Sequence, residues 1–214
     1  MIKQVSLDHG WFYHYRLHNA KLGLLKGNGF SPLHDYLHTV FDKCPREPFL
    51  TGPRSSQLKF DLGIKPRQID NHEVSVLAKE GLHWNKYRDA HSNVQVFMLS
   101  YDRNTIGVEV PIWLHAHELG SGKKFQELFS TDEPLSGHID ALRLEDDKLW
   151  IWDYKPRAAK EKYASTQTFF YALMLSKRTG IPLDKFMCGY FDDTTSFVFK
   201  PHEKYLNERQ ATLR

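Results

Sequence analysis

The sequence predicts a mixed α/β fold in which helices cover a small sheet. Segments rich in β-branched or alternating apolar side chains at 105–114, 137–144 and 148–155 predict three strands. Segments with apolar positions at helical spacing lie before and after them, at 70–92 and 160–178. From residue 70 onwards the predicted order is therefore helix, three strands, helix, two strands, helix.

Composition restricts the class of protein but not its chemistry. The 214 residues suffice for one domain with a core and an extension, and 29 basic against 26 acidic side chains leave a net charge of +3. Affinity for nucleic acid must then come from local patches rather than from bulk charge. No stretch approaches the roughly 18 apolar residues of a transmembrane helix, and the start lacks the apolar stretch of a signal peptide. We therefore expect a cytoplasmic protein without a membrane partner.

The first 70 residues differ in character from the rest. They contain many glycine and proline residues and one short helical stretch at 33–41. We expect residues 1–70 to form an irregular N-terminal arm or small helical subdomain, and residues 71–214 to form the core.

The core is expected to open with the helix over 70–92, for which Asp70 or Asn71 can provide the N-cap. The strand that follows, at 105–114, contains Pro111. Because proline has no N–H for the ladder, it suggests a sheet edge or a bulge there.

The next two strands are expected to form a hairpin. Residues 137–144 alternate, residues 145–147 are turn formers, and residues 148–155 alternate again. Pro156 ends the second strand.

A second long helix is expected over about 160–178, because Gly180 follows at the usual position for a helix end. Residues 185–191 and 195–200 predict two more strands, and residues 203–213 predict a terminal helix.

The candidate site lies in the hairpin. Asp140 interrupts an apolar strand, and Asp153 and Lys155 stand two apart on the next strand, so their side chains share a face. Carboxylates among apolar neighbours are costly to desolvate unless they are paired or bind a cation. Their oxygen ligands suit Mg²⁺ or Mn²⁺, whereas a solvated strand end or a rim salt bridge is the alternative for the tripeptide alone.

Gln167 and Tyr171 extend the candidate site onto the following helix. They are four residues apart and therefore share one helical face. The alternative is a polar cap on a helix that is otherwise buried.

Three segments of this region together resemble the motif series of the PD-(D/E)XK nuclease superfamily, and within it the RecB-like branch to which lambda exonuclease is related. The segments are Gly137-His-Ile-Asp140, Trp152-Asp153-Tyr-Lys155 and Gln167-Thr-Phe-Phe-Tyr171-Ala-Leu. The resemblance covers roughly residues 71–200. It implies a restriction-endonuclease-like core of helix, three strands, helix and strand.

The resemblance also implies a metal and a reaction. Asp140 and Asp153 would hold one or two Mg²⁺ or Mn²⁺ ions, helped by the main-chain carbonyl of Tyr154. Lys155 would orient the attacking water or help to deprotonate it. An in-line phosphodiester displacement gains from such a metal, because the metal lowers the pKa of water and stabilises negative charge.

Four residues are candidates for contacts with nucleic acid. By the resemblance, Gln167 and Tyr171 would contact the backbone or brace the site. Arg157 and Lys160 belong to a basic cluster just after Lys155, which suits phosphate contacts or, alternatively, a solvated helix start. Exposed aromatic side chains could add stacking surfaces for single strands, although such residues more often lie in a core.

The resemblance places an acidic residue or a histidine on the first core helix, and the spacing leaves several candidates. Glu80 is preferred, with His83 second; Glu73 is a further candidate, and all three could instead be ordinary exposed residues. Glu109 is an alternative from the first strand, because a strand glutamate lies near this site in some relatives.

The expected activity is that of an Mg²⁺- or Mn²⁺-dependent deoxyribonuclease, an exonuclease acting on DNA ends or single strands in repair or recombination. A catalytically weak or inactive nucleic-acid-binding subunit and a restriction-type endonuclease are the alternatives. Cys44 resembles the residue that begins a four-cysteine iron–sulfur cluster in RecB-like proteins. The chain has one other cysteine, Cys188, so we expect no such cluster. Because ring-forming relatives exist, a homo-oligomer is a further candidate.

Overall fold

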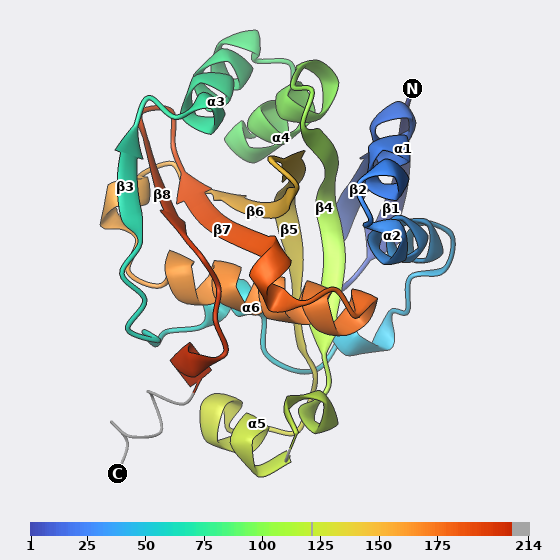
Figure 1. The fold of residues 1–214 in the computed structure, drawn as a ribbon, viewed down its shortest axis with the longest axis vertical. Helices are drawn as coiled ribbons and strands as arrows, with labels where there is room; N and C mark the ends of the chain where they lie inside the picture. The colour runs from blue at the N-terminus through green and yellow to red at the C-terminus, as the bar shows by residue number, and fades with distance from the viewer. Residues whose placement is uncertain (121, 207–214) are drawn as a thin grey trace.

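Eight strands form one mainly antiparallel sheet in the computed structural model, which describes residues 1–120 and 122–206 (Figure 1). Their order across the sheet is β1-β2-β4-β5-β6-β7-β8-β3. The strands are β1 (Ile2–Asp8), β2 (Phe12–His18), β3 (Arg67–Asp70), β4 (Thr105–Leu114), β5 (Leu135–Glu145), β6 (Lys148–Tyr154), β7 (Phe186–Phe191) and β8 (Thr195–Phe199). The helices are α1 (Asn19–Gly27), α2 (Ser31–Lys43), α3 (Glu73–Trp84), α4 (Ala90–Tyr101), α5 (Gly122–Phe129) and α6 (Ala164–Thr179). In this part of the chain no helix is both long and apolar enough to cross a membrane.

The predicted mixed α/β class is confirmed, and so is the order of the central elements. β4 occupies the predicted range, and β5 and β6 form the predicted hairpin around a turn in which Asp146 and Asp147 both have positive φ. β6 and β7 are parallel because α6 connects them as a crossover. α6 ends at Gly180, whose φ of 71° allows its N–H to bond the carbonyl of Ser176.

The helix predicted over 70–92 is wrong, because two helices occupy this region. Asn85 adopts a left-handed conformation, with φ of 45°, and its N–H bonds the carbonyl of Gly81, which ends α3. α4 then starts with a new N-cap, since the carboxylate of Asp89 accepts the N–H of Ser92 at 2.7 Å. The cap residue was visible in the sequence, but the apolar stripe on either side of it predicted one helix.

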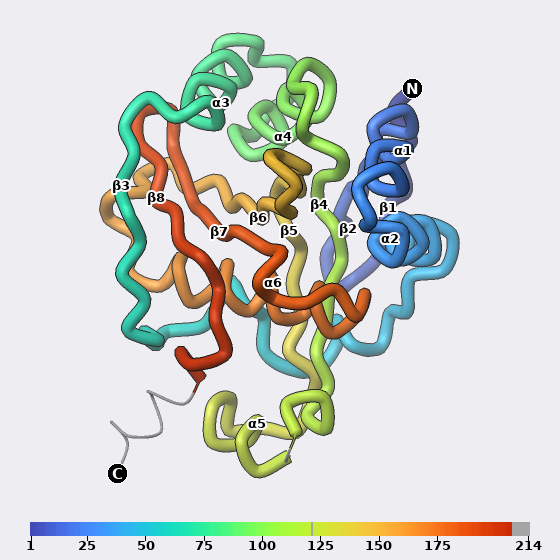
Figure 2. Tube along the Cα trace, viewed as in Figure 1, coloured from blue at the N-terminus to red at the C-terminus, as the bar shows by residue number. Residues whose placement is uncertain are grey.

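The N-terminal region combines the predicted helical stretch at 33–41, which lies within α2, with two strands that were not predicted. β1 and β2 form a hairpin, and β2 joins β4 through Arg16 and Leu17. At the other edge of the sheet β3 pairs with β8 (Figure 2). The first 70 residues therefore build both edges, and the predicted boundary near residue 70 falls inside one continuous sheet.

Pro111 lies in an interior strand, not at a sheet edge. The bulge is earlier, where the register of β4 against β5 shifts between Thr105 and Gly107. β2 covers only a short part of β4 near residues 107 and 108, so the missing N–H of Pro111 faces no strand, and its carbonyl accepts the hydroxyl of Tyr36 at 2.7 Å.

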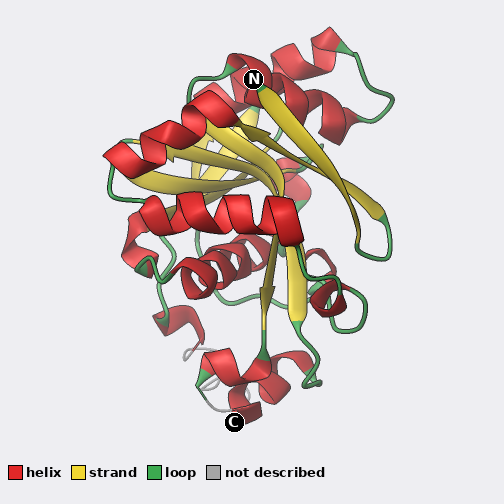
Figure 3. Ribbon diagram, turned by 90° about the vertical axis from the view of Figure 1, so that its right-hand side faces the viewer, coloured by secondary structure: helices red, strands yellow, loops and turns green. Residues whose placement is uncertain are grey.

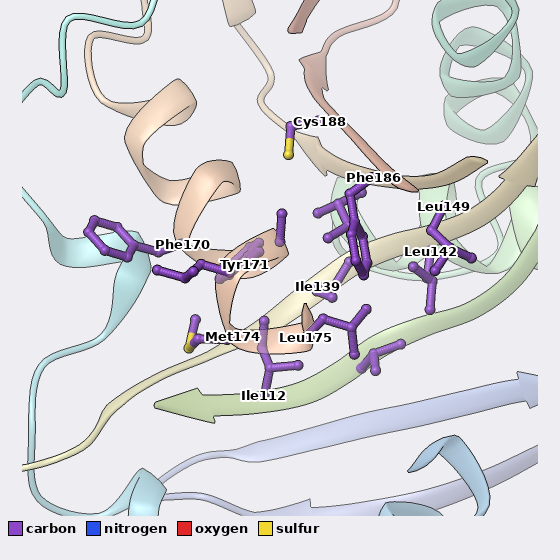
Figure 4. Close-up of a cluster of buried hydrophobic side chains, with 14 of the residues drawn as sticks. Ile112, Ile139, Leu142, Leu149, Phe170, Tyr171, Met174, Leu175, Phe186 and Cys188 are labelled. Carbon is purple, nitrogen blue, oxygen red and sulfur yellow. The ribbon is translucent and has the colours of Figure 1, made fainter. Parts of the chain in front are cut away.

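α6 packs against the middle of the sheet and forms the main core with it (Figure 4). The residues labelled there are Ile112, Ile139, Leu142, Leu149, Phe170, Tyr171, Met174, Leu175, Phe186 and Cys188. Each large apolar side chain buried in this way contributes roughly 1.5–3 kcal/mol. The packing therefore fixes the position of α6, and with it the polar residues that α6 presents to the sheet. The terminal helix predicted over 203–213 lies mainly outside the described residues.

Candidate active site

The site forms where β5 and β6 separate. Their pairing runs from Glu145 opposite Lys148 to Ala141 opposite Trp152 and ends there. Beyond this point β5 continues beside β4 and β6 continues beside β7. Asp140 is the next residue of β5 and Asp153 is the next residue of β6, so both aspartates lie at the fork between the two strands.

The side chain of Asp140 bonds the main chain of β6 at the point where the β5–β6 pairing ends. Its Oδ2 accepts the main-chain N–H of Tyr154 at 2.8 Å, in place of a backbone carbonyl of β5. The Nε2 of His91, which α4 supplies, lies 3.9 Å from the same oxygen. The Asp140 side chain is thereby held toward the fork while its carboxylate stays partly accessible.

Asp153 is 1% exposed and has an unusual environment for a carboxylate. Its Oδ1 accepts a hydrogen bond from Gln167 Nε2 at 2.8 Å, and its Oδ2 lies 2.6 Å from Lys155 Nζ. Apart from this ion pair with Lys155, Oδ2 has no hydrogen-bond partner within the described residues. Burial raises the pKa of Asp153 to about 6, although Lys155 opposes the change.

Lys155 stays charged at this position. Burial alone lowers the pKa of its ammonium group, but the carboxylates of Asp153 and Asp140 outweigh burial and raise it. Its main-chain N–H bonds the carbonyl of Phe191 at 2.8 Å, which fixes the backbone just past the end of β6. The site therefore holds a cation directly beside its two aspartates.

Gln167 and Tyr171 are both buried against this cluster. The amide nitrogen of Gln167 donates to Asp153 and also to the hydroxyl of Tyr171 at 2.8 Å. Tyr171 packs flat against β5 because residue 137 is glycine: a Cβ there would lie 2.4 Å from Tyr171 Cε1. Of the two predicted roles, these contacts support bracing of the site.

A Gly137→Ala substitution tests this packing. We expect a loss of about 1–3 kcal/mol in the free energy of unfolding, because the added methyl overlaps a buried ring. Urea unfolding provides the measurement. Gly23→Ala is the matched control, because a Cβ at Gly23 of α1 meets no atom within 4 Å; an equal loss in both variants would contradict the packing argument.

Glu109 adds a third carboxylate from β4. It has a φ of 53° inside a strand, a conformation that costs a residue other than glycine roughly 1–3 kcal/mol and is found mainly at functional sites. Its Oε1 accepts Gln95 Nε2 of α4 at 2.7 Å. Burial, reinforced by the charge of Asp140, raises the pKa of Glu109 to about 8.

The raised pKa of Glu109 predicts a dependence of stability on pH. In the metal-free protein the folded state keeps this proton up to about pH 8, whereas the unfolded chain releases it near pH 4.5. The free energy of unfolding should therefore fall as pH rises through this window, by up to about 1.4 kcal/mol per pH unit.

Glu109→Gln removes this titration, so the variant should gain stability relative to the wild type as pH rises from 5 to 8. Thermal or urea unfolding in EDTA measures the difference. Glu80→Gln, at an exposed position of α3, is the control. Parallel stability curves for the wild type and Glu109→Gln would contradict the assignment.

The first-helix candidates do not meet at the fork. Glu80 and His83 are exposed on α3, where His83 Nδ1 contacts the carbonyl of Lys79, and Glu73 pairs with Arg143. The helix that reaches the site is α4, through His91 and Gln95. The predicted helix ended at residue 92, so His91 stood at its end and Gln95 lay outside every predicted element; the capping sequence from Asp89 to Ser92 was the available indication of a second helix. Arg157 and Lys160 are exposed just beyond Lys155.

A cavity of about 150 Å³ lies over the fork. Twelve residues line it: Tyr13, Arg54, Ser56, His91, Glu109, Gly137, His138, Asp140, Asp153, Lys155, Gln167 and Tyr171. A volume of this size holds several water molecules, because each occupies about 30 Å³ in the liquid. The N-terminal region that was predicted to be irregular thus supplies part of the wall.

The residues of the cavity fit a divalent cation that prefers oxygen ligands. Three carboxylates line it, and Asp153 Oδ2 is a buried carboxylate oxygen that has no hydrogen-bond partner besides Lys155 within the described residues. In residues 1–120 and 122–206, no set of three His, Cys, Asp or Glu side chains is gathered closely enough to enclose a metal. An open site suits Mg²⁺, which usually keeps several waters and takes one or two carboxylates.

Comparison with known proteins gives one match. A family model, described as the PD-(D/E)XK nuclease superfamily, matches residues 33–211. No curated protein and no solved structure matches the chain. The matched segment contains the whole fork and leaves out the β1–β2 hairpin.

Proposed function

Because this chain belongs to the PD-(D/E)XK nuclease superfamily, we propose that it hydrolyses DNA phosphodiester bonds at the fork between β5 and β6, in a divalent-metal-dependent reaction. Enzymes of this superfamily are nucleases that generally use divalent metals such as Mg²⁺. The observation that carries the proposal is the buried arrangement of Asp153, Lys155 and Gln167 beside Asp140.

Asp140 and Asp153 would hold the cation, with the main-chain carbonyl of Tyr154 as a further ligand. When bound, the cation lowers the pKa of a water molecule and stabilises the negative charge that develops on the phosphate. Glu109 lines the same cavity and is the candidate for a third carboxylate, in place of Glu80 and His83.

Lys155 supplies a positive charge at the cavity. Its ammonium group is kept charged by the two aspartates and faces the cavity that they line. There it orients the attacking water and offsets charge on the phosphate. Gln167 holds Asp153 through Oδ1, so Oδ2 keeps one direction, and Tyr171 in turn fixes Gln167.

The substrate is proposed to be a DNA end or single strand, processed exonucleolytically in repair or recombination. The small volume of the cavity supports this, since the wall that Tyr13 and Arg54 provide stands close to the carboxylates. Arg157 and Lys160 are exposed in the segment that follows Lys155, and they would contact phosphates.

A second candidate function is a nucleic-acid-binding subunit that does not turn over. One observation favours it: Lys155 already pairs with Asp153 Oδ2, and the described carboxylates form no closed metal site.

The deciding experiment compares end-labelled linear DNA with covalently closed circular DNA. Both are used in single- and double-stranded form, and RNA of the same sequence is included. Each is incubated with Mg²⁺, with Mn²⁺ or with EDTA. We expect metal-dependent release of nucleotides from linear DNA and no cleavage of circles. Cleavage of circles would indicate an endonuclease, and binding without any metal-dependent cleavage would support the non-catalytic alternative.

A further inference from the structure

The β1–β2 hairpin carries two exposed aromatic side chains at its tip. Trp11 is 78% exposed and Phe12 is 75% exposed. The two strands pair along their whole length, but β2 joins the sheet only through Arg16 and Leu17. The tip therefore projects away from the body of the sheet (Figure 3).

The projecting tip is nevertheless held firmly. His9, between the two strands, is 2% exposed; its ring stacks on Phe49 with centroids 3.7 Å apart. Its Nδ1 lies 2.9 Å from Nε2 of His138, in β5. Arg46 also pairs with Asp8 at 2.6 Å. A tip anchored in this way loses little conformational entropy when a ligand binds to it.

The same anchor connects the tip with the candidate active site. Tyr13 stacks on His138 with centroids 3.7 Å apart, and His138 lies two residues before Asp140. Arg54 donates to the Tyr13 hydroxyl at 2.8 Å and to the carbonyl of His9. Tyr13, His138 and Arg54 all line the cavity. A buried cluster of aromatic rings, with His9 2% and His138 5% exposed, thus connects the exposed tip to Arg54 at the cavity wall.

Exposed aromatic rings next to a cation are what an unpaired nucleic-acid strand requires. Bases stack on aromatic side chains whatever their sequence, and the phosphates need positive charge. In a duplex the faces of the bases are already covered by their neighbours, so rings at this tip suit an unpaired strand. The hairpin precedes the segment that the family model matches, at 33–211.

We propose that the tip of the β1–β2 hairpin is a nucleobase-binding site, which holds an unpaired strand by stacking on Trp11 and Phe12 while Arg54 receives its phosphate at the cavity. This inference rests on the proposed function and specifies where its substrate binds.

The test compares a twelve-nucleotide oligothymidylate with an abasic oligomer of the same length and charge. Affinities are measured by fluorescence anisotropy in EDTA. The wild type should bind the oligothymidylate at least about tenfold more tightly than the abasic strand. The Trp11→Ala/Phe12→Ala variant should lose about ten- to a hundredfold in affinity for the oligothymidylate, and its affinity for the abasic strand should stay unchanged.

Two further variants make the result specific. Tyr101→Ala removes a ring that is 62% exposed on α4, so it should leave both affinities unchanged. Trp11→Tyr keeps a stacking ring and should retain most of the affinity. Melting temperatures are compared to establish that the variants are folded, which we expect because both replaced side chains are exposed.

Three results would overturn the inference. These are equal wild-type affinities for the two oligomers, equal losses for both in the double variant, and a wild-type dimer that this variant dissociates without loss of oligothymidylate affinity. The last would mark the tip as a self-association surface; sedimentation measures it. Cleavage with Mg²⁺ is read separately, so failure of the proposed hydrolysis is distinguishable from failure of base stacking.

Discussion

Replacing Asp153 by asparagine is expected to lower the rate of DNA hydrolysis by at least about 10²–10³-fold, the loss typical of removing one preorganised charged group from an active site. Asparagine keeps an acceptor for Gln167 at the position of Oδ1 and has nearly the same shape. It removes the negative charge that pairs with Lys155 and that would hold the cation. The rate of hydrolysis should therefore fall strongly, whereas the packing around α6 should be retained.

Single-turnover cleavage of a labelled oligonucleotide measures this loss, and circular dichroism shows whether the fold is retained. Asp184→Asn is the matched control: Asp184 is exposed before β7, at the opposite end of the strands from the fork. If the Asp153→Asn protein is folded and its activity is within about tenfold of the wild type, the fork is not the site of the reaction. An equal loss in Asp184→Asn would show that the effect is not local.

Replacing Arg143 by methionine is expected to destabilise the protein by about 3–5 kcal/mol, the usual consequence of removing one partner from a buried ion pair. Arg143 is fully buried, and its Nε lies 2.9 Å from Asp102 Oδ2. It also pairs with Glu145 at 3.0 Å and with Glu73 at the start of α3. Methionine fills a similar volume but leaves the Asp102 carboxylate buried without its main counter-charge.

The effect of Arg143→Met should depend on pH in a definite direction. Burial alone raises the pKa of Asp102, but Arg143 and neighbouring hydrogen bonds outweigh burial and lower it. The ionised Asp102 carboxylate therefore stabilises the folded protein at any pH above the pKa that Asp102 has in the unfolded chain. This stabilisation is lost as pH falls through the lower pKa that Asp102 has in the folded protein. Without Arg143 the buried carboxylate can escape its penalty by protonation. The difference between wild type and variant should therefore shrink from pH 7 toward pH 4.

Urea unfolding at several pH values tests this expectation, with the exposed Arg88→Met as control. The double variant Arg143→Met/Asp102→Asn should recover part of the lost stability, because it leaves one buried charge fewer. A single variant as stable as the wild type at pH 7 would show that the network contributes nothing.

Local sequence patterns were sufficient to predict the elements that form the fork. β5, β6 and α6 follow one another along the chain, and each has its own alternation or helical spacing and its own breaker, such as Pro156 or Gly180. The side chains of Asp140, Asp153 and Lys155 could therefore be assigned to neighbouring strands from the sequence alone. Which oxygen each carboxylate offers could not be predicted, because this depends on packing.

The parts that sequence reasoning missed are those that depend on contacts over long distances in the chain. The resemblance named Glu109 as one of several candidates, but its geometry was missed, because no propensity predicts a left-handed residue inside a strand. Tyr13 and Arg54 reach the cavity only because β2 pairs with β4 and because residues 53–55 bond Ser136 at the start of β5. His91 was not a candidate, because the N-cap at Asp89 that starts its helix was overlooked.

The construction of both sheet edges from the first 70 residues has a consequence for how the molecule folds. β3 can pair only after β8 exists, with Arg67 opposite Val198, so the first-made part of the chain waits for the last. Closing so long a loop costs entropy before any contact repays it. The fork, by contrast, is local in the chain. We therefore expect the fork to form early and β3 to join the sheet late, so that this edge of the sheet stays open until β8 has formed.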